Sequence, residues 1–417
     1  MSPRSAALSL AFANVGHLFT HMLMLLYPTV VLALEGRYGL SYGELLALSM
    51  PGFVLYGVAA LPAGWLGDRW SAEYMIVIYF LGSGAAAIAT GLAGGPVGLA
   101  IGLTALGLFG SIYHPVGVAW LVRNAENRGR VLGWNGIFGS LGVGVASFVA
   151  GGLTDLWSWR AAFIVPGAIC MALGVALLFL VRGRHVVALK TDRKPSPEPE
   201  RADVRRVFIV LSITMLCAGI MWQMLTVSLP KLFELRLAGL TSGGTFGTGG
   251  LVSLVFLVSA GVTIVGGLLA DRYPLKQVYL WAWVAQIPVM VVIIHATELP
   301  LLSLMILLFS LEVMTGPAEN SLLVRYTPGR WRATAFGAKF VLAQGVSALG
   351  VPLVGYVFDA TGDFLWMFGI LIALGLAIVA AAIYLPREPA KLRDAGGGPG
   401  GIAAHRSYST FPQTPIA

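Results

Sequence analysis

Charged residues are scarce in this sequence, and long apolar runs take their place. Asp, Glu, Lys and Arg make up 11% of the 417 residues, whereas a soluble domain carries about 25%. Hydrophobic residues account for 57% of the chain, and the mean hydropathy is +0.82. A globular core could not absorb this much apolar surface, so the composition excludes a soluble protein and indicates a chain embedded in a bilayer.

Cysteine is almost absent, and so are the motifs of common enzymes. Cys170 and Cys217 are the only two cysteines, and both lie in apolar runs, which argues against a disulfide framework. The sequence contains no phosphate-binding loop, no zinc-type cysteine spacing and no catalytic triad. We therefore expect neither an enzyme nor a nucleotide-driven pump, and we expect no cofactor and no resident metal.

Twelve runs are apolar and long enough to cross a hydrocarbon core of about 30 Å as helices of about 20 residues. The first six cover residues 8–34, 45–65, 74–93, 97–122, 131–153 and 160–181. The second six cover residues 207–230, 248–270, 277–295, 300–324, 333–357 and 364–385. The first run is too long for a signal peptide and lacks a clear cleavage site, so we expect it to be a span. The sequence thus predicts an all-α integral membrane protein with twelve transmembrane helices.

The basic residues predict the orientation of these helices. If the N-terminus is cytoplasmic, 22 of the 27 Lys and Arg residues lie in segments on that side and four on the other. The positive-inside rule favours this arrangement, with both termini in the cytoplasm and the protein in the inner (plasma) membrane. Since the basic residues lie in short loops, the net charge of +8 does not indicate a nucleic-acid partner.

Charge and proline divide the chain into four parts. A stretch containing "KPSPEPE" separates the two groups of spans, and "GGGPGG" occurs in the tail. Such compositions favour an extended linker and a disordered segment. We expect two six-helix bundles at 1–181 and 207–385, a cytoplasmic linker at 182–206 and a disordered cytoplasmic tail at 386–417.

The two groups of spans share sequence features in register. "GWLGDRW" at Gly64–Trp70 returns as "GLLADRY" at Gly267–Tyr273, and "HPVGVAWLVR" at His114–Arg123 returns as "GPAENSLLVR" at Gly316–Arg325. Single residues that also match at this spacing are Arg128 with Arg330, Arg130 with Arg332, and Asp155 with Asp359. Such duplication is typical of secondary transporters, whose substrate site lies near the bilayer midplane between the halves.

On these features the chain resembles the major facilitator superfamily. The resemblance rests on the two groups of six spans, the basic central loop, and a Gly-x-Leu-x-Asp-Arg element after the second span of each half. It implies two pseudo-symmetric bundles and a conformational latch at the cytoplasmic face. The latch positions are Gly64, Asp68, Arg69, Gly267, Asp271 and Arg272, with the repeated arginines Arg123, Arg130, Arg325 and Arg332. The alternative is that Asp68 and Arg69 only cap and anchor helix ends at the interface.

Two further motifs bear on the branch of that family. The "YHP" at Tyr113–Pro115, together with a histidine early in the first span, is similar to the fosmidomycin-resistance branch of drug exporters. The fifth span ends in "VAGGL", like the antiporter signature, but lacks its Gly-Pro pair. The arginine that proton-coupled antiporters carry on the fourth helix is also missing, and His114 is the nearest ionisable group.

Three histidines are candidates for proton coupling. In the family that this chain resembles, the first and fourth helices of each half line the cavity. His17 and His114 each lie about 12 to 13 Å from the cytoplasmic end of such a helix, and His21 is one turn from His17 on the same face. Imidazole exchanges protons near neutral pH. The alternative for each is a neutral histidine that packs against a helix carbonyl.

The second half offers carboxylates. Glu319 and Lys339 lie at nearly the same depth, and we expect them to form an ion pair, because pairing reduces the cost of burying both charges. Glu312, at the centre of the tenth span, has no obvious partner, which suits a coupling group; the alternative is a packing hydrogen bond. Further polar and aromatic candidates near the same region are Asn14, Tyr113, Trp222 and Gln223.

These observations favour a secondary active transporter that works by alternating access, with proton-coupled efflux of a small organic compound as the first hypothesis. A second hypothesis is transport of a metal ion or its chelate, because three imidazoles and a carboxylate could ligate a divalent cation. A third is a non-transporting membrane sensor on the same fold. The expected partners are a small-molecule substrate, protons and the lipid bilayer, and we expect a monomer.

Overall fold

The computed structural model describes residues 3–124, 128–185, 201–241, 244–327 and 332–386. Within these ranges every regular element is helical, and twelve helical spans are long and apolar enough to cross a membrane. The predicted fold class and all twelve spans are therefore confirmed, with ends that differ by a few residues. The tail from residue 387 and most of the expected linker lie outside the described residues.

The N-terminal bundle contains the first six spans, two of which are broken into shorter helices. They are α1 (Pro3–Leu34); α2 (Tyr42–Ala47), α3 (Met50–Val58) and α4 (Ala60–Arg69); α5 (Ala72–Gly91); α6 (Pro96–Gly110), η1 (Tyr113–Gly117) and α7 (Val118–Arg123); α8 (Arg128–Leu156); and α9 (Ala161–Arg182). The starts follow local chemistry. Ser41 and Glu44 form a capping box at α2, Ser71 caps α5, and α6 begins with a proline.

The C-terminal bundle contains the other six spans, of which the fifth is broken into shorter helices. Its elements are α10 (Arg201–Arg236); α11 (Thr245–Arg272); α12 (Leu275–Ile293); α13 (Glu298–Tyr326); α14 (Arg332–Phe340), η3 (Val341–Gly345), η4 (Val346–Leu349) and α15 (Gly350–Thr361); and α16 (Leu365–Ile383). Helix α10 starts within the stretch 182–206 that was expected to be linker. Its first turns contain Arg205 and Arg206, and arginine is a good helix former, so the helix continues beyond the apolar span.

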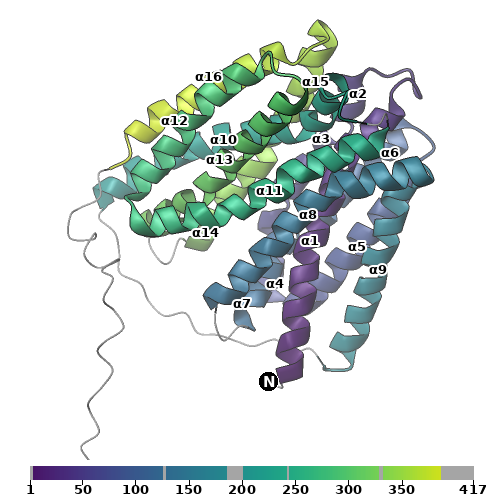
Figure 1. The fold of residues 1–417 in the computed structure, drawn as a ribbon. Coiled ribbons are helices and arrows are strands. Elements are labelled where there is room, and N and C mark those ends of the chain that lie inside the picture. The colour runs from purple at the N-terminus through teal and green to yellow at the C-terminus, as the bar shows by residue number, and fades with distance from the viewer. Residues whose placement is uncertain (1–2, 125–127, 186–200, 242–243, 328–331, 387–417) are drawn as a thin grey trace, which may run out of the picture.

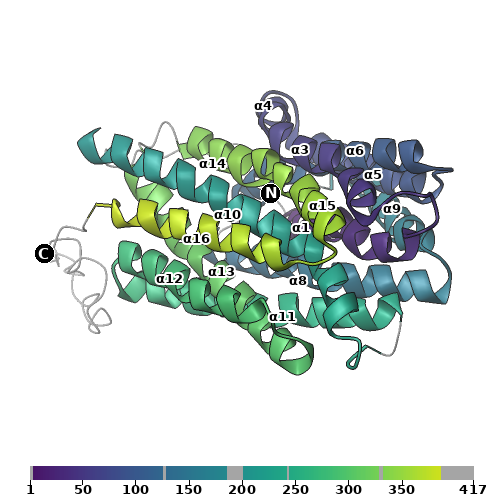
Figure 2. The same cartoon turned by 90° about the horizontal axis from the view of Figure 1, so that it is seen from above.

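The bundles meet along two seams. Helices α8 and α11 run side by side (Figure 1), and glycines remove the side chains that would separate them. A Cβ atom added to Gly249 would lie 2.2 Å from the backbone oxygen of Ser147, and one added to Gly151 would lie 2.3 Å from that of Thr245. At the second seam α2 lies against α15, and α3 lies against η3. From these seams the bundles diverge, so that the first residues of α1 and α10 are far apart (Figures 1 and 2).

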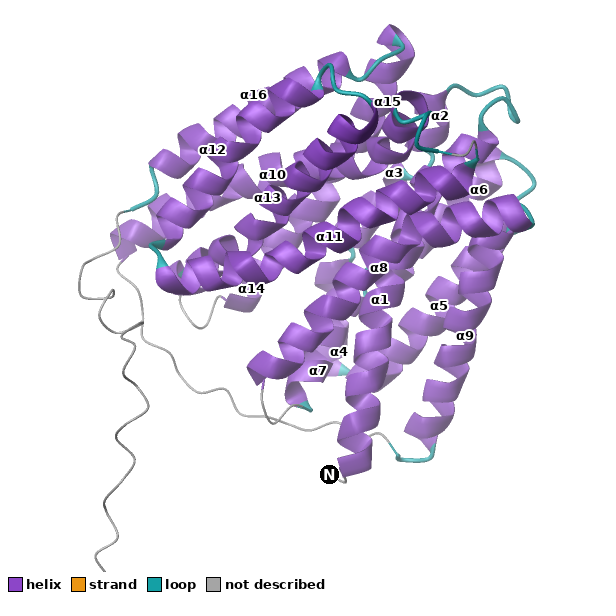
Figure 3. Cartoon of the chain, viewed as in Figure 1, coloured by secondary structure: helices purple, strands orange, loops and turns teal. Residues whose placement is uncertain are grey.

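Two spans leave regular α-helical geometry where the bundles meet. Tyr113–Gly117 and Val341–Gly345 are single turns of π-helix, the second followed by a 3₁₀ turn, inside otherwise α-helical spans. Figure 3 shows only helices, joined by loops, in the part of the chain that the structure describes. Wider turns of this kind are frequent at functional sites. The first contains Pro115, which lacks a backbone N–H, and it carries His114 toward α1.

Candidate functional site

The three predicted histidines come together at one place. Helix α1 supplies His17 and His21, one turn apart, and η1 supplies His114. The Nε2 atoms of His17 and His21 are 3.2 Å apart, and the three rings lie with centroids 5.0 to 5.2 Å from one another. One ring nitrogen from each residue lies within 4.8 Å of the other two. The structure thus brings together the histidines of the first and fourth spans.

A backbone carbonyl fixes the hydrogen positions on His17. Its Nδ1 lies 2.7 Å from the backbone oxygen of Asn135 on α8. A carbonyl oxygen only accepts hydrogen bonds, so Nδ1 carries the hydrogen and Nε2 of the neutral ring carries a lone pair. His21 Nε2 must then donate to His17 Nε2. In the neutral cluster the two rings thus share one N–H···N hydrogen bond.

The His17 ring fits against α8 because residue 139 is a glycine. A Cβ atom there would lie 2.5 Å from Cε1 of His17, which is too close for any side chain. On its other side His17 stacks on Tyr113, with centroids 5.1 Å apart and ring planes 21° apart. The ring is therefore held on two sides and by one hydrogen bond.

Asn135 was not predicted, and it connects several residues that were. Its Nδ2 atom donates to the Tyr113 hydroxyl at 2.9 Å and to Oδ1 of Asn14 at 3.1 Å, and Tyr113 donates to the backbone oxygen of Ala13 at 2.6 Å. Asn14 and Tyr113 therefore position the helix segment beside His17. The available signal in the sequence was the one amide side chain within the glycine-rich fifth span.

The C-terminal bundle closes one side of the cluster. Phe340, at the end of α14, lies with its ring 4.8 Å from His114 and 5.6 Å from Tyr56 of α3. The Tyr56 hydroxyl is 3.0 Å from Nε2 of His114. Because α14 belongs to the opposite bundle, any movement between the bundles changes the surroundings of His114. Neither Tyr56 nor Phe340 was among the predicted site residues.

The carboxylates of the C-terminal bundle lie in two different environments. Lys339 Nζ is 2.6 Å from Glu319 Oε1, so the predicted ion pair is present, and Tyr279 donates to the other carboxylate oxygen at 2.9 Å. Lys339 also donates to Asn320 at 2.7 Å. Glu312 is buried, and its Oε2 atom has no hydrogen-bond partner among the described residues.

Trp222 and Gln223 lie on α10 in the C-terminal bundle. Trp222 packs against Phe256 and Phe309, with ring centroids 6.2 and 5.7 Å away. Gln223 is buried, and its Nε2 atom has no partner in the part of the chain that the structure describes. Trp222 therefore belongs to an aromatic cluster within its own bundle.

The expected latch positions of the N-terminal half are joined within one bundle. Arg123 donates to Asp68 at 3.1 Å, Arg69 stacks over the Trp65 ring at 4.4 Å, and a Cβ atom on Gly64 would lie 3.0 Å from Pro115. In the second half, Gly267, Asp271 and Arg272 lie in the last two turns of α11, and Arg325 lies in the last turn of α13. Arg130 lies in the first turn of α8. Arg332 begins α14, and its side chain lies outside the described residues.

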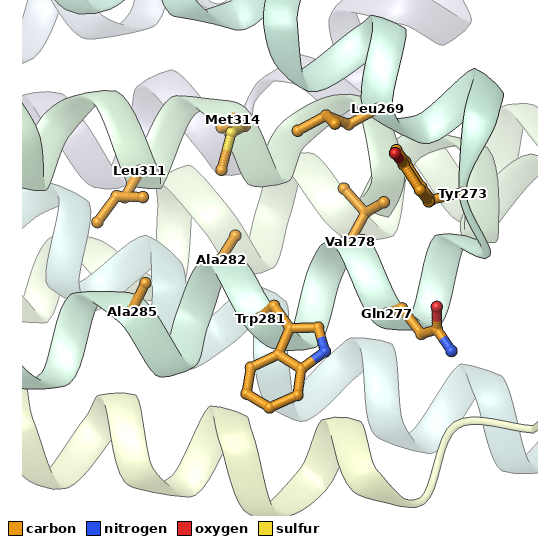
Figure 4. Close-up of a pocket in the computed structure, with 9 residues that line it drawn as sticks. All are labelled: Leu269, Tyr273, Gln277, Val278, Trp281, Ala282, Ala285, Leu311 and Met314. Carbon is orange, nitrogen blue, oxygen red and sulfur yellow. The ribbon is translucent and has the colours of Figure 1, made fainter.

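A groove of about 270 Å³ lies away from this site, between α11, α12 and α13 (Figure 4). Its lining is almost wholly apolar and includes Leu311, Met314 and Trp281, whose side chain is exposed. None of the predicted site residues lines it. Such a lining offers few hydrogen-bond partners to a polar substrate.

Known structures resemble the whole molecule. A bacterial homologue of the human lysosomal transporter Spinster matches in two inward-facing forms. The occupied form has a TM-score of 0.74 and 13% identity over 95% of this chain and 98% of that one, and the unoccupied form a TM-score of 0.70 and 14% identity over 92% and 95%. A D-xylose–proton symporter matches with a TM-score of 0.71 and 14% identity, over 91% of this chain and 97% of its own.

Sequence comparison identifies the family. A comparison with curated proteins gave no match. The family model described as Major Facilitator Superfamily matches residues 10–350, which is most of the chain and includes the histidine cluster and the C-terminal bundle as far as the start of α15. The twelve spans, the two bundles and this match together show that the chain belongs to the Major Facilitator Superfamily of membrane transporters.

Proposed function

We propose that this transporter exports a small organic compound in exchange for protons. The observation that carries the proposal is the cluster of His17, His21 and His114, which lies where the two bundles meet and which, among the described residues, includes no carboxylate. Three neutral imidazoles in contact can accept one proton and share it, because each ring nitrogen is either a donor or an acceptor. The cluster is therefore suited to bind and release single protons.

Alternating access supplies the coupling. Phe340 belongs to the C-terminal bundle and His114 to the N-terminal bundle, so rocking of one bundle against the other changes the water around the cluster. Hydration changes the proton affinity of a buried group. Protons would thus bind in one state and leave in the other, and the same movement would carry the substrate.

The walls of the site favour a lipophilic compound. Tyr56, Tyr113 and Phe340 surround the histidines, and none of these side chains is charged. An organic molecule with aromatic or aliphatic surface could displace water from such walls.

We also propose that the protein works as a monomer in the inner (plasma) membrane, because a single chain supplies both bundles and the contacts between them.

The test is proton-driven flux in proteoliposomes. Candidate compounds come from a growth-inhibition screen with and without the protein, and an imposed pH gradient drives their transport. We expect the single substitutions His17→Gln, His21→Gln and His114→Gln each to reduce this flux at least tenfold. His295→Gln, an exposed histidine outside the cluster, is the matched control and should transport normally. Wild-type flux in all three cluster variants would exclude the proposed role, and absence of flux for every compound would favour a non-transporting sensor.

Glu312 is proposed as a second proton site. Its buried, unpartnered carboxyl oxygen can take up a proton without breaking an ion pair. Glu312→Gln keeps the size of the side chain and removes the titration. We expect this variant to equilibrate the compound down its own gradient while losing accumulation driven by the pH gradient. Full proton-driven accumulation in Glu312→Gln would assign the residue to packing.

A further inference from the structure

We propose that His17, His21 and His114 form a binding site for a divalent transition-metal ion such as Zn²⁺. Metal binding is a separate property from proton exchange, and it can be measured without any transport assay. Imidazole nitrogen suits Zn²⁺, Ni²⁺, Co²⁺ and Cu²⁺, whereas Mg²⁺ and Ca²⁺ prefer oxygen ligands. Three protein ligands with a fourth position open are the usual set at zinc sites that exchange ligands.

The distances fit such an ion. Two nitrogens that each lie about 2.0 to 2.1 Å from a tetrahedral Zn²⁺ are about 3.3 Å from one another. The Nε2 atoms of His17 and His21 are 3.2 Å apart, which is close to this spacing, so an ion bound beside the line between them would take the place of their shared hydrogen bond. His21 then carries its hydrogen on Nδ1. A ring nitrogen of His114 lies within 4.8 Å of both, so a small side-chain rotation would complete the set.

The surroundings already orient the ligands. A metal-binding histidine usually donates its other ring N–H to a carbonyl or carboxylate, which fixes the tautomer and points the lone pair at the metal. His17 does this with the backbone oxygen of Asn135 at 2.7 Å, and its ring is confined between Gly139 and Tyr113. His114 has its Nε2 atom beside the Tyr56 hydroxyl, which holds that ring as well.

The lack of a negatively charged ligand in this set limits its affinity for a divalent ion. No carboxylate belongs to the three-residue set, so the double positive charge of the ion is not neutralised by its ligands. A cation in the membrane interior without a counter-charge is costly. We therefore expect exchangeable binding at micromolar concentrations rather than a permanent structural ion.

The experiment is a titration of the full-length protein in detergent, purified through an affinity tag without histidines. Zn²⁺ is added in competition with a chromogenic chelator, and Co²⁺ absorption reports nitrogen ligands. We expect one equivalent of Zn²⁺ per chain, no competition by Mg²⁺, and at least tenfold weaker binding in His21→Gln and His114→Gln. His295→Gln should bind as the wild type does, and thermal unfolding confirms that each variant is folded.

Either of two results would overturn the metal site: no stoichiometric Zn²⁺ binding by the wild type, or equal binding by the cluster variants and the control. These results are distinct from failure of the proposed export, which is measured as flux of an organic compound without added metal. A protein that binds Zn²⁺ and moves no organic compound would keep this inference and reject the other.

A second inference rests on a different observation: two matched aspartates cap helices across the bundle interface. Asp155, near the end of α8, accepts hydrogen bonds from the backbone N–H groups of Thr245 and Phe246 at 3.3 and 2.8 Å, where α11 begins. Asp359, near the end of α15, accepts one from Gly43 N–H at 3.0 Å and another from the Ser41 hydroxyl, where α2 begins. Each contact joins one bundle to the other.

The geometry points to a second latch, distinct from the one expected at the cytoplasmic face. Asp155 and Asp359 form it at the end of the molecule opposite the N-terminus. The two aspartates occupy matching positions of the duplicated halves, so one symmetric device closes both seams. A carboxylate at a helix N-terminus satisfies free N–H groups and interacts favourably with the helix dipole. Separation of the bundles at this end must break both caps, which favours the state that the structure shows.

Spin-label distances test the latch. The labels are placed at Gly94→Cys and His295→Cys, in loops of opposite bundles at this end, after the native cysteines are replaced by alanine. One lost cap corresponds to about a fivefold change in an equilibrium. We expect the ratio of long to short distances to rise about fivefold in Asp155→Ala or Asp359→Ala and about 25-fold in the double variant, since distant sites are additive.

The control is Asp363→Ala, at the same end, because Asp363 pairs with Arg236 inside one bundle. It should leave the distance ratio unchanged. Ser41→Ala, which removes one donor and no charge, should give a smaller shift and serves if an aspartate variant misfolds. An unchanged distance ratio in the folded double variant, or in Ser41→Ala if the double variant is unfolded, would contradict the latch.

Discussion

Asn135 shows how one polar residue determines the chemistry of its neighbours. Its backbone oxygen fixes the tautomer of His17, while its side chain holds Tyr113 and Asn14. Nothing in the local sequence shows that this residue faces α1 instead of the lipid. The histidines themselves could be predicted, because ionisable groups in a membrane span are rare and demand a partner.

The first prediction at the residue scale concerns Glu319 and Lys339. Removing one partner of a buried ion pair leaves the other charge uncompensated, at a cost of about 3 to 5 kcal/mol. Lys339 remains partly exposed, so we expect Lys339→Gln to lower the free energy of unfolding by about 2 to 3 kcal/mol. The double variant with Glu319→Gln should recover much of this loss.

Thermal unfolding in detergent measures both effects, and a double-mutant cycle gives the coupling between the two residues. Asn320 accepts a hydrogen bond from Lys339 but carries no charge, so Asn320→Ala is the control and should cost less. Equal losses in Lys339→Gln and in the double variant would show that the ion pair contributes nothing beyond Lys339 itself.

At the scale of the helical elements, glycines decide which face of α8 approaches α1. Gly139 lies against the His17 ring, whereas a Cβ atom added to Gly136 would have no other atom within 4 Å among the described residues. The sequence shows that the fifth span is rich in glycine, and close helix packing is the expected consequence. Which glycine meets which partner depends on the rotation of α8, and only the packed structure reveals it.

The second prediction uses these two glycines. Gly139→Ala places a methyl group 2.5 Å from the unmoved His17 ring, so the ring must shift away from the Asn135 carbonyl. We expect a loss of about 1 to 3 kcal/mol in unfolding free energy, as for other overpacked sites. Impaired proton-driven flux should accompany this loss.

Gly136→Ala is the matched control on the same helix. It should leave flux unchanged, because nothing lies within 4 Å of the added atom. Its stability should rise slightly, since alanine is the better helix former. The interpretation would be refuted by equal defects in both variants, measured by unfolding and by proteoliposome flux.

At the scale of the whole molecule, the twelve spans place the start of α1 and the end of α16 on the same side. The excess of basic residues in the loops on that side predicts that this side is cytoplasmic. The third prediction is therefore a labelling pattern for single cysteines in a chain whose native cysteines are replaced by alanine.

Gly94→Cys lies between α5 and α6, and Trp70→Cys lies between α4 and α5. A membrane-impermeant maleimide should label Gly94→Cys in intact cells and should label Trp70→Cys only after permeabilisation. The reverse pattern would place the termini outside and would reverse the direction of transport that we propose.

The sequence by itself determined the number of spans, the duplication and the family, because these depend on hydrophobicity and motif spacing along the chain. It also identified the three histidines and the Glu319–Lys339 pair, because ionisable side chains in a membrane span are costly unless they have a polar or charged partner. The tertiary structure alone decided the roles of Asn135, Tyr56 and Phe340, and the crossed caps made by Asp155 and Asp359. These contacts join distant residues, and they depend on the rotation and crossing of helices, which many sequences with the same apolar pattern could adopt differently.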